Sequence, residues 1–342
     1  MRAMLLAGGM STRLYPLTKQ VPKPLVPVAG EPNSGHLMRY LKAYGIEEVA
    51  INVFYLAERI VEAFGTGSRY GVKLEYLHEA ALTGSAGAVK QMEHFLSDGT
   101  FVTVYCDAIT DVKLDELIAF HRERKSLATI ALLEAEEVDQ FGVVVLDDEG
   151  RVQGFQEKPK RGEERSRLVN TGIYIFEPEI FQYIPPERFY DFGNDVFPQL
   201  LAAGVPFHGL HMRGAYWTDI GTLGEFRRGT EDVLAGRIRF PGARATGVDP
   251  SARVAASARI EGLVRVGERV EIGENVVIEG PSVIGDDVKI GDGAEVRRSI
   301  LFDGVSVGKE SKVTDSIIGL RYRIGDDEWI QDAVMSYEPI IV

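Results

Sequence analysis

The sequence predicts an α/β protein in which a mostly parallel sheet with helices on both faces is followed by a parallel β-helix. Two observations predict this fold. Short apolar runs alternate with helix-like segments up to about residue 235, and from residue 248 onward aliphatic residues recur every six positions. A length of 342 residues also favours two domains. We place the first domain at residues 1–236, a linker at 237–246, and the β-helix with a C-terminal tail at 247–342.

The first domain is predicted from its alternating pattern. The apolar runs at 4–7, 48–53 and 101–105 are typical of buried strands, whereas 35–43 and 86–95 have apolar residues at helical spacing. Strands that alternate with helices indicate a Rossmann-like, mostly parallel sheet. Ligands of such sheets bind at the carboxyl ends of the strands, so we expect the site there.

The β-helix is predicted from a six-residue repeat. Its aliphatic or aromatic positions are Val248, Val254, Ile260, Val266, Ile272, Ile278, Ile284, Ile290, Val296 and Phe302, and after a slip of one residue Val307, Val313, Ile318 and Ile324. A glycine directly follows many of these residues, and we expect each repeat residue to point inward. At three strands per coil, the stretch predicts about four coils. The segment resembles the left-handed β-helix of hexapeptide-repeat proteins, and Pro241 and Gly242 mark the linker before it.

The charge of the chain is unevenly distributed. The formal net charge of −13 argues against nucleic acid or an anionic membrane as the main partner. Residues 1–30 nevertheless contain Arg2, Arg13, Lys19 and Lys23 and no acidic residue, which favours an anion site. The single cysteine, Cys106, excludes an internal disulfide. With no signal-like or membrane-spanning run apparent, we expect a cytoplasmic protein.

A glycine-rich motif follows the first predicted strand. It reads Leu6-Ala7-Gly8-Gly9-Met10-Ser11-Thr12-Arg13-Leu14, and Pro22-Lys23-Pro24 follows it. Glycines let the backbone approach a phosphate and present N–H groups to it. Arg13 offers a planar fork for phosphate oxygens, and the two prolines restrict the backbone around Lys23. The spacings fit neither a Walker A loop nor a dinucleotide-binding fingerprint.

The full string resembles the signature of nucleotide-sugar pyrophosphorylases, which are sugar-1-phosphate nucleotidyltransferases. Further blocks agree with that family in order and spacing: Gly84-Ser85-Ala86-Gly87, Asp107, Phe141-Gly142, Phe155-Gln156-Glu157-Lys158-Pro159, Val169-Asn170-Thr171-Gly172 and Trp217-Thr218-Asp219-Ile220-Gly221. The resemblance spans essentially the whole chain. Two positions depart from the usual pattern, because Cys106 and Ser11 stand where glycine is frequent.

The resemblance also implies roles for individual residues. Arg13 and Lys23 would be catalytic, and Asp107 and Asp219 would bind Mg²⁺. The nucleotide would be bound by Leu6, Ala7, Gly8, Gly9, Ser11, Thr12, Gly84 and Ser85. The sugar phosphate would be bound by Gly142, Glu157, Lys158 and Asn170.

The reaction implied is transfer of a nucleotidyl group from a nucleoside triphosphate to a sugar 1-phosphate, with release of pyrophosphate. The β-helix and the Gly84–Gly87 loop look similar to mannose-1-phosphate guanylyltransferases, which use GTP. Enzymes that act on glucose 1-phosphate with dTTP, UTP or ATP share nearly every motif, and a non-catalytic homologue that binds nucleotide sugars is a further alternative. An acyltransferase in the β-helix is disfavoured, because the last histidine is His211. We expect the β-helix to join subunits into a homo-oligomer.

Overall fold

The computed structural model describes residues 1–242 and 244–337, which form two compact units. The first unit contains residues 1–9 and 37–218, and the second contains 10–36 and the described part of 219–342. Segment 10–36 therefore belongs to the same unit as the C-terminal part of the chain. These units cut across the domains expected from the sequence, whose boundaries at 236 and 247 stay a proposal.

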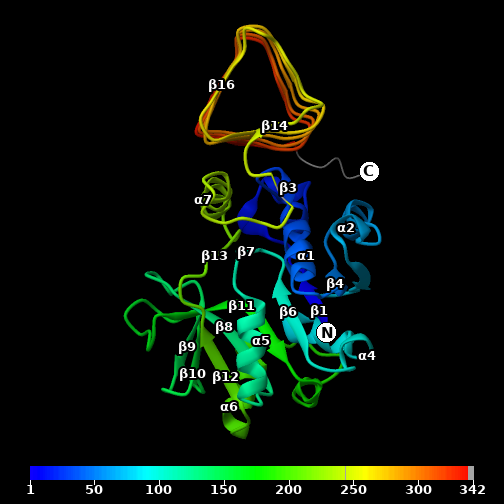
Figure 1. The fold of residues 1–342 in the computed structure, drawn as a ribbon, viewed down its shortest axis with the longest axis vertical. Helices are drawn as coiled ribbons and strands as arrows, with labels where there is room; N and C mark the ends of the chain where they lie inside the picture. Colours follow the sequence, from blue (N-terminus) through cyan, green and yellow to red (C-terminus); the bar gives the residue numbers. More distant parts are fainter. Residues whose placement is uncertain (243, 338–342) are drawn as a thin grey trace. The chain divides into compact units, whose positions relative to one another are not determined.

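A mixed sheet forms the centre of the first unit (Figure 1). Its main path is β10-β9-β11-β6-β1-β4-β5, and β8 joins β11 to β12. The strands are β1 (Arg2–Leu6), β4 (Glu48–Val53), β5 (Lys73–His78), β6 (Phe101–Tyr105), β8 (Ala128–Glu134), β9 (Gly142–Leu146), β10 (Val152–Glu157), β11 (Leu168–Phe176) and β12 (Phe207–His211). β6, β1, β4 and β5 are parallel, so the predicted Rossmann-like core is confirmed. β11 runs antiparallel to β6 and β8, which the apolar pattern did not predict.

Burial on both faces explains the apolar runs of the central strands. Ala3, Met4 and Leu5 are fully buried, as are Phe101 and Val102. A strand covered on both faces reads as a continuous apolar run instead of an alternating one. The described side chains of an aromatic cluster, which includes Phe176, Phe192 and Phe197, pack beside these strands.

Two of the seven described helices were predicted by position, at 35–43 and 86–95, and both are found near the predicted ranges. The seven helices are α1 (Asn33–Ala43), α2 (Ala57–Phe64), α3 (Gly84–Gln91), α4 (Glu93–Leu96), α5 (Leu114–Glu123), α6 (Phe197–Ala203) and α7 (Leu223–Leu234). The predicted helix 86–95 is divided into α3 and α4 at Met92. A short two-stranded sheet pairs β7 (Ala108–Thr110) with β13 (Trp217–Asp219). Of the described helices, none combines the length and the apolar character needed to span a bilayer.

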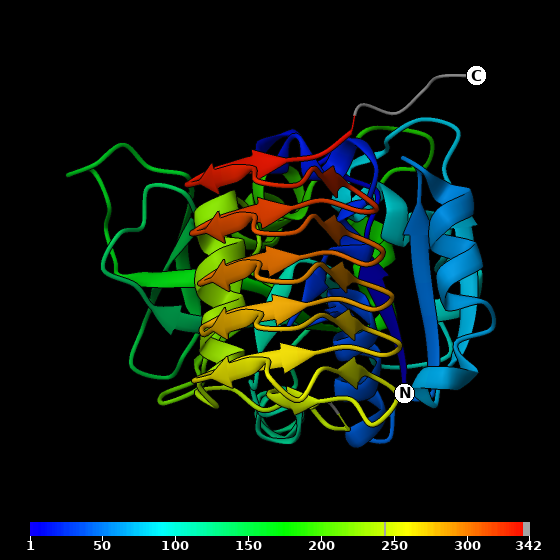
Figure 2. The same cartoon turned by 90° about the horizontal axis from the view of Figure 1, so that it is seen from above.

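The second unit joins segment 10–36 and α7 to the β-helix. Segment 10–36 contains the 3₁₀ turns η1 (Thr12–Leu14), η2 (Leu17–Lys19) and η3 (Lys23–Leu25), and a small hairpin of β2 (Pro27–Val28) and β3 (Glu31–Pro32). Viewed along its axis, the β-helix has a triangular outline, and the side view shows its coils stacked on one another (Figures 1 and 2).

Three parallel sheets make up the sides of the β-helix. The first contains β14 (Gly247–Val248), β17 (Val264–Val266), β20 (Ser282–Ile284), β23 (Ile300–Leu301), β26 (Ile317–Ile318) and β29 (Val334–Met335). The second contains β15 (Arg253–Val254), β18 (Glu271–Ile272), β21 (Lys289–Ile290), β24 (Ser306–Val307) and β27 (Arg323–Ile324). The third contains β16 (Arg259–Glu261), β19 (Val277–Glu279), β22 (Glu295–Arg297), β25 (Lys312–Thr314) and β28 (Trp329–Gln331). The predicted β-helix is thus confirmed, although sheets of six, five and five strands make more coils than the four expected.

The glycine that follows many inward residues is required by the next coil. A methyl group at Gly273 would lie 2.5 Å from Oδ1 of Asp292 and 2.9 Å from its backbone nitrogen. The same carboxylate accepts the backbone N–H of Glu274 at 3.0 Å. A larger side chain would collide with this contact between coils, so the repeat uses glycine there.

One repeat position was assigned wrongly from the sequence. Leu301 pairs with the inward residues Ile284 and Ile318, and it lies in the core. Phe302 therefore points outward, where its ring contacts Phe226 of α7 edge to face. The first slip falls between Val296 and Leu301, because the corner between β22 and β23 is one residue shorter than the two earlier corners, β16–β17 and β19–β20. The shorter corner recurs between β25 and β26 and between β28 and β29.

Burial within the stack predicts how two matched substitutions differ. Val296 lies in the interior of the β-helix and is 0% exposed, whereas Val254 occupies an inward position near the open end and is 38% exposed. We expect Val296→Ala to lower the free energy of unfolding by about 2 kcal/mol, because it leaves a cavity. Val254→Ala should change it by less than about 0.5 kcal/mol. Urea denaturation of both variants checks this, and equal losses would contradict the inward register.

Candidate active site

The first part of the glycine-rich motif is fixed by contacts of the first unit. The backbone N–H of Ala7 donates to Oδ1 of Asn52 at 2.7 Å, and Leu6 O accepts from the N–H of Cys106 at 3.0 Å. A methyl group at Gly8 would lie 2.6 Å from both Asn52 Nδ2 and a carboxylate oxygen of Glu79. Gly8 is thus needed for close packing, while Gly9 is exposed with open space beside it.

A buried polar network lies beneath this motif. Asn52 Nδ2 donates to Glu79 Oε2 at 2.6 Å, and Glu79 Oε1 accepts from both the N–H and the hydroxyl of Thr83, at 3.1 and 2.6 Å. The network connects Ala7 to the loop that begins α3. Sequence reasoning missed Asn52 and Glu79. The available signal was a polar residue within the apolar part of strand β4 and a carboxylate directly after β5.

The Gly84–Gly87 loop is held by a segment far along the chain. Ser85 donates its N–H and its hydroxyl to Asp191 Oδ1, both at 2.9 Å. Tyr190 O accepts the backbone N–H groups of Ala86 and Gly87, and Gly84 has a φ of +79°. The N–H of Ser85 is thus already hydrogen-bonded within the protein, to Asp191. Its predicted contact with nucleotide remains a proposal.

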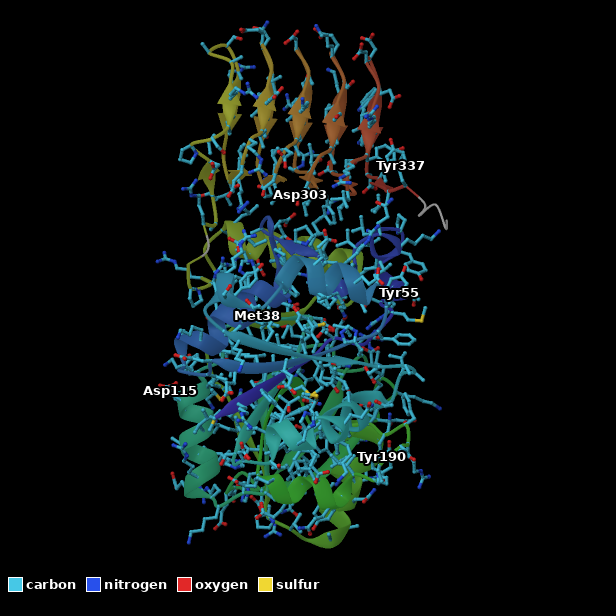
Figure 3. All side chains as sticks on the ribbon, turned by 90° about the vertical axis from the view of Figure 1, so that its right-hand side faces the viewer. Met38, Tyr55, Asp115, Tyr190, Asp303 and Tyr337 are labelled. Carbon is cyan, nitrogen blue, oxygen red and sulfur yellow. The ribbon has the colours of Figure 1, made fainter. Side chains whose placement is uncertain are left out.

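The segment that contains Asp191 also lies beside the predicted sugar-phosphate residues. A methyl group at Gly193 would lie 2.7 Å from Glu157 Oε2, and one at Gly142 would lie 3.1 Å from the same oxygen. The carboxylate of Glu157 is thus flanked by backbone that carries no side chain. Segment 190–193, which includes Asp191, was not predicted from the sequence. Tyr190, which is labelled in Figure 3, begins this segment, and its hydroxyl accepts a hydrogen bond from Nε2 of Gln199 in α6.

Partial burial is the main cause of a raised pKa at Glu157. Its side chain is 31% exposed, and Lys158 Nζ lies 3.9 Å from Oε1. Partial burial raises the pKa of the Glu157 carboxyl, the positive charge of Lys158 opposes that shift, and the negative charge of Asp191 adds to it. Lys158 has a φ of +45°, and its ammonium is mostly exposed at the surface of the loop.

Asn170 lies where the β11–β8 ladder is irregular. The register shifts between Asn170 and Tyr174. Asn170 Oδ1 accepts the N–H of Gly172 at 3.0 Å, and Nδ2 donates to the hydroxyl of Tyr174 at 2.9 Å. Gly172 has a φ of +75° and packs on the ring of Tyr105. The family-like Asn-Thr-Gly string therefore builds a bulge that fixes the Asn170 side chain.

The second unit holds Arg13 and Lys23, the two cationic residues predicted to be catalytic. Ser11 has a φ of +53°, a conformation that favours glycine, and its carbonyl accepts from the hydroxyl of Thr18 at 2.8 Å. This turn begins η1, in which Thr12 and Arg13 are exposed. Lys23 is half-buried at the start of η3, between the buried Pro22 and Pro24.

Arg13 and Asp219 approach each other at Gly221. A methyl group at Gly221 would lie 2.9 Å from Asp219 Oδ2, 2.9 Å from Glu225 Oε2 and 3.4 Å from a terminal nitrogen of Arg13. Glu225 Oε2 is buried, and the described residues give it no hydrogen-bond partner. A carboxylate pair with an oxygen to spare suits a hard divalent cation. Asp107, half-buried between β6 and β7 of the first unit, offers the same type of ligand. In the part of the chain that the structure describes, no group of three or more His, Cys, Asp or Glu side chains lies close enough together to hold a metal ion.

Comparison with known proteins identifies the class. The family model described as nucleotidyl transferase matches residues 2–236, and a second model, described as GMPPB C-terminal domain, matches 260–341. The chain therefore belongs to the nucleotidyl transferase family. It is an enzyme of the nucleotidyltransferase class, as the sequence motifs predicted.

Three relatives illustrate the range within the family. The chain is 37% identical to a UTP–glucose-1-phosphate uridylyltransferase of Synechocystis, across 94% of this chain and 88% of that one. It is 34% identical to a mannose-1-phosphate guanylyltransferase of Mycobacterium tuberculosis, across 71% and 67% of the two chains. A Bacillus anthracis structure named as a glucose-1-phosphate thymidylyltransferase aligns with a TM-score of 0.63 and 28% identity. That alignment covers 70% of this chain and 97% of the other.

The buried network predicts a large effect for Asn52→Ala. The substitution leaves the N–H of Ala7 and one oxygen of Glu79 without their partner. We expect the free energy of unfolding to fall by about 2–3 kcal/mol. Asn194→Ala, at an exposed position of the same unit, should change it by less than about 0.5 kcal/mol. Denaturation curves monitored by circular dichroism distinguish the two, and an unchanged midpoint for Asn52→Ala would contradict the network.

Proposed function

We propose that the chain joins a nucleoside triphosphate to a hexose 1-phosphate and releases pyrophosphate. The observation that best supports the proposal is that Arg13 and Asp219 both approach Gly221, because a guanidinium suits a phosphate and a nearby carboxylate suits a metal ion. The family match and the names of the relatives support the same reaction class.

The chemistry needs positioning and charge neutralisation, and no side-chain nucleophile. A phosphate monoester has a second pKa near ~6, so an oxygen of the sugar phosphate is already an anion at neutral pH. That oxygen attacks the α-phosphorus of the triphosphate, the bond to the β-phosphate oxygen breaks, and pyrophosphate leaves with the electron pair. The difficulty is repulsion between two anions, which cations in fixed places relieve.

The residues of this chain divide that work. Arg13 holds the departing pyrophosphate, and Lys23 stabilises charge on the α-phosphate. Leu6, Ala7, Gly8, Gly9, Ser11 and Thr12, with Gly84 and Ser85, hold the nucleotide, while Gly142, Glu157, Lys158 and Asn170 hold the sugar phosphate. Mg²⁺ bound by Asp107 and Asp219 would neutralise phosphate charge.

The choice of base and sugar is proposed from the comparisons. The match of residues 260–341 to the GMPPB C-terminal domain and the guanylyltransferase relatives favour GTP and mannose 1-phosphate. The Synechocystis uridylyltransferase, which aligns across nearly the whole chain, favours UTP and glucose 1-phosphate as the second candidate, with dTTP or ATP as further alternatives. A non-catalytic homologue is disfavoured, because Lys23, Asp107 and Asp219 are all present.

We also propose a cytoplasmic homo-oligomer. Nucleoside triphosphates and sugar phosphates are cytoplasmic metabolites, and the one cysteine, Cys106, is buried as a free thiol. The β-helix exposes edge strands at the end of its stack, with Val248 and Val254 more than one-third exposed, and such a surface favours contact with a second copy.

The metal assignment predicts the behaviour of two aspartate variants. Asp107→Asn and Asp219→Asn each replace a charged oxygen ligand by a neutral amide. We expect each to lower the rate of pyrophosphate release by roughly 100-fold or more, and to raise the Mg²⁺ concentration needed for half of the maximal rate. Asp98→Asn, on an exposed ion pair with Arg2, is the matched control. Wild-type rates and Mg²⁺ dependence in both variants would refute the assignment.

The raised pKa of Glu157 predicts a pH dependence. An ionised Glu157 can accept hydrogen bonds from sugar hydroxyls with both oxygens, and the protonated acid loses part of that capacity. Burial raises the pKa, so this loss begins at a higher pH than for a free glutamate. We expect Glu157→Gln to lower kcat/KM for the sugar phosphate by about tenfold at pH 8.

Dividing kcat/KM of the wild type by kcat/KM of Glu157→Gln isolates the effect of the Glu157 carboxyl. The titration of the sugar phosphate affects both proteins equally and cancels in this ratio. The ratio should fall towards one as the pH is lowered through the raised pKa. Glu163→Gln, an exposed neighbour, should match the wild type throughout. A ratio that stays constant with pH would show that the ionised form of Glu157 is not what binds the sugar.

A further inference from the structure

One side of the β-helix has an apolar outer surface. On the sheet from β14 to β29, the outward positions pair across the coils in one row, which runs Gly247, Arg265, Val283, Ile300, Ile317 and Val334. Val283, Ile300 and Ile317 point away from the interior, yet they are only 1%, 5% and 1% exposed. This side is therefore covered by other parts of the chain.

Helix α7 supplies part of that cover. Phe226 contacts Phe302 edge to face, and both rings are buried. Arg227 donates to two corner carbonyls of the β-helix, Arg298 O at 3.2 Å and Asp315 O at 2.6 Å. Figures 1 and 3 show α7 along the side of the stack that carries β14, and Figure 3 marks Asp303, which follows Phe302, on that side.

Segment 10–36 is fixed in the same unit by a ring stack. His36 lies parallel to Phe240 with ring centroids 4.1 Å apart, and both side chains are buried. His36 Nε2 lies 3.0 Å from Val28 O, in the first strand of the β2–β3 hairpin. The stretch that leads into the β-helix thus packs on His36, which in turn contacts the hairpin that follows Lys23.

Arg265 contacts the turn of that hairpin. Gly30 has a φ of +79°, and a methyl group there would lie 2.7 Å from Cζ of Arg265 and 3.2 Å from its Nε, overlapping the guanidinium. Arg265 Nε donates to Arg244 O at 3.2 Å, which fixes the plane of the guanidinium. Its Nη1 is buried, with no hydrogen-bond partner in the described part of the chain. A half-buried charged residue with one buried nitrogen therefore interrupts the apolar row, at the point where the row meets the hairpin.

Short backbone bonds connect this turn to Lys23. The N–H of Val26 donates to Lys23 O at 3.1 Å, and the N–H of Asn33 donates to Val26 O at 3.1 Å. The second of these bonds closes the segment 26–33, within which β2 and β3 pair with each other. A shift of the turn at Gly30 is thus transmitted through few rotatable bonds to the backbone of Lys23.

We propose that Arg265 of the β-helix is a positioning residue for catalysis, which holds the β2–β3 hairpin and through it the Lys23 ammonium. The inference rests on the proposed role of Lys23 in nucleotidyl transfer. The β-helix is then part of the catalytic apparatus, because a coil supplies the support that Lys23 requires. A small displacement of a catalytic cation lowers the rate of the chemical step strongly, whereas it changes ground-state binding much less.

The test uses the full chain with Arg265→Met, which keeps the length of the side chain and removes its charge. Arg253→Met is the matched control, because Arg253 lies on the neighbouring sheet and is 80% exposed. Steady-state pyrophosphate release gives kcat and KM, and hydrogen exchange read by mass spectrometry gives the protection of residues 22–33. We expect Arg265→Met to lower kcat by about tenfold, with KM for both substrates within about twofold. Exchange at 22–33 should quicken by about tenfold or more.

Gly30→Ala tests the same contact from the hairpin side, and so keeps the proposal falsifiable if Arg265→Met fails to fold. It should reproduce the fall in kcat and the faster exchange. The proposal would be overturned if the variants that fold keep kcat within twofold of wild type and show unchanged hydrogen exchange at residues 22–33. If the wild-type chain transfers no nucleotide, the proposed function fails, and the exchange comparison alone then decides whether Arg265 holds the hairpin.

Discussion

The covered outer row of the β-helix is the constraint on which the second unit depends. Burying three aliphatic side chains such as Val283, Ile300 and Ile317 contributes roughly 1.5–3 kcal/mol each. Segment 10–36 follows β1 and ends within α1, yet it shares a compact unit with the last third of the chain. The residues proposed to neutralise the triphosphate are therefore held by contacts with the C-terminal part of the chain. The glycines at 8 and 9 belong to the other unit.

This arrangement suits the electrostatics of the proposed reaction. A chain with a net charge of −13 must still bring two anions together, and it gathers cations in a stretch of 30 residues without an acid. Mobile cations would lose much of their effect, because charge stabilisation in a site depends on groups that are already in place. The 3₁₀ turns, the prolines around Lys23 and the stacked His36–Phe240 pair all restrict that segment. For Glu157 the relevant property is its pKa, which is raised by partial burial, and its carboxylate lies between two glycines.

Periodicity predicted the fold well, because each pattern has a direct geometric cause. The β-helix was predictable since every coil must place an aliphatic residue inward and leave no side chain where the next coil's aspartate packs, as at Gly273 and Asp292. Phe302 was misassigned because the period of six cannot show which corner has lost a residue. The doubled aliphatics Val283-Ile284, Ile300-Leu301 and Ile317-Ile318 were the available signal for the covered side.

The site was only partly predictable. Motifs located the residues proposed to touch substrates, but not those that hold them, because the supporting contacts join distant positions. Asn52 lies 45 residues from Ala7, and Asp191 lies 106 residues from Ser85. Neither supporting residue belongs to a string that resembles a signature. Their importance follows from burial and hydrogen bonding, which one sequence does not display.

The central claim is that this chain catalyses nucleotidyl transfer to a sugar 1-phosphate. The most direct measurement is pyrophosphate release by the full chain with GTP, UTP, dTTP or ATP, each paired with mannose 1-phosphate or glucose 1-phosphate, in Mg²⁺ and in EDTA. The account predicts Mg²⁺-dependent release for at least one pair, at about 1 s⁻¹ or faster, and a rate in EDTA lower by roughly 100-fold. Absence of release from every pair, with the protein folded and nucleotide bound, would contradict it and would indicate a binding protein instead of an enzyme.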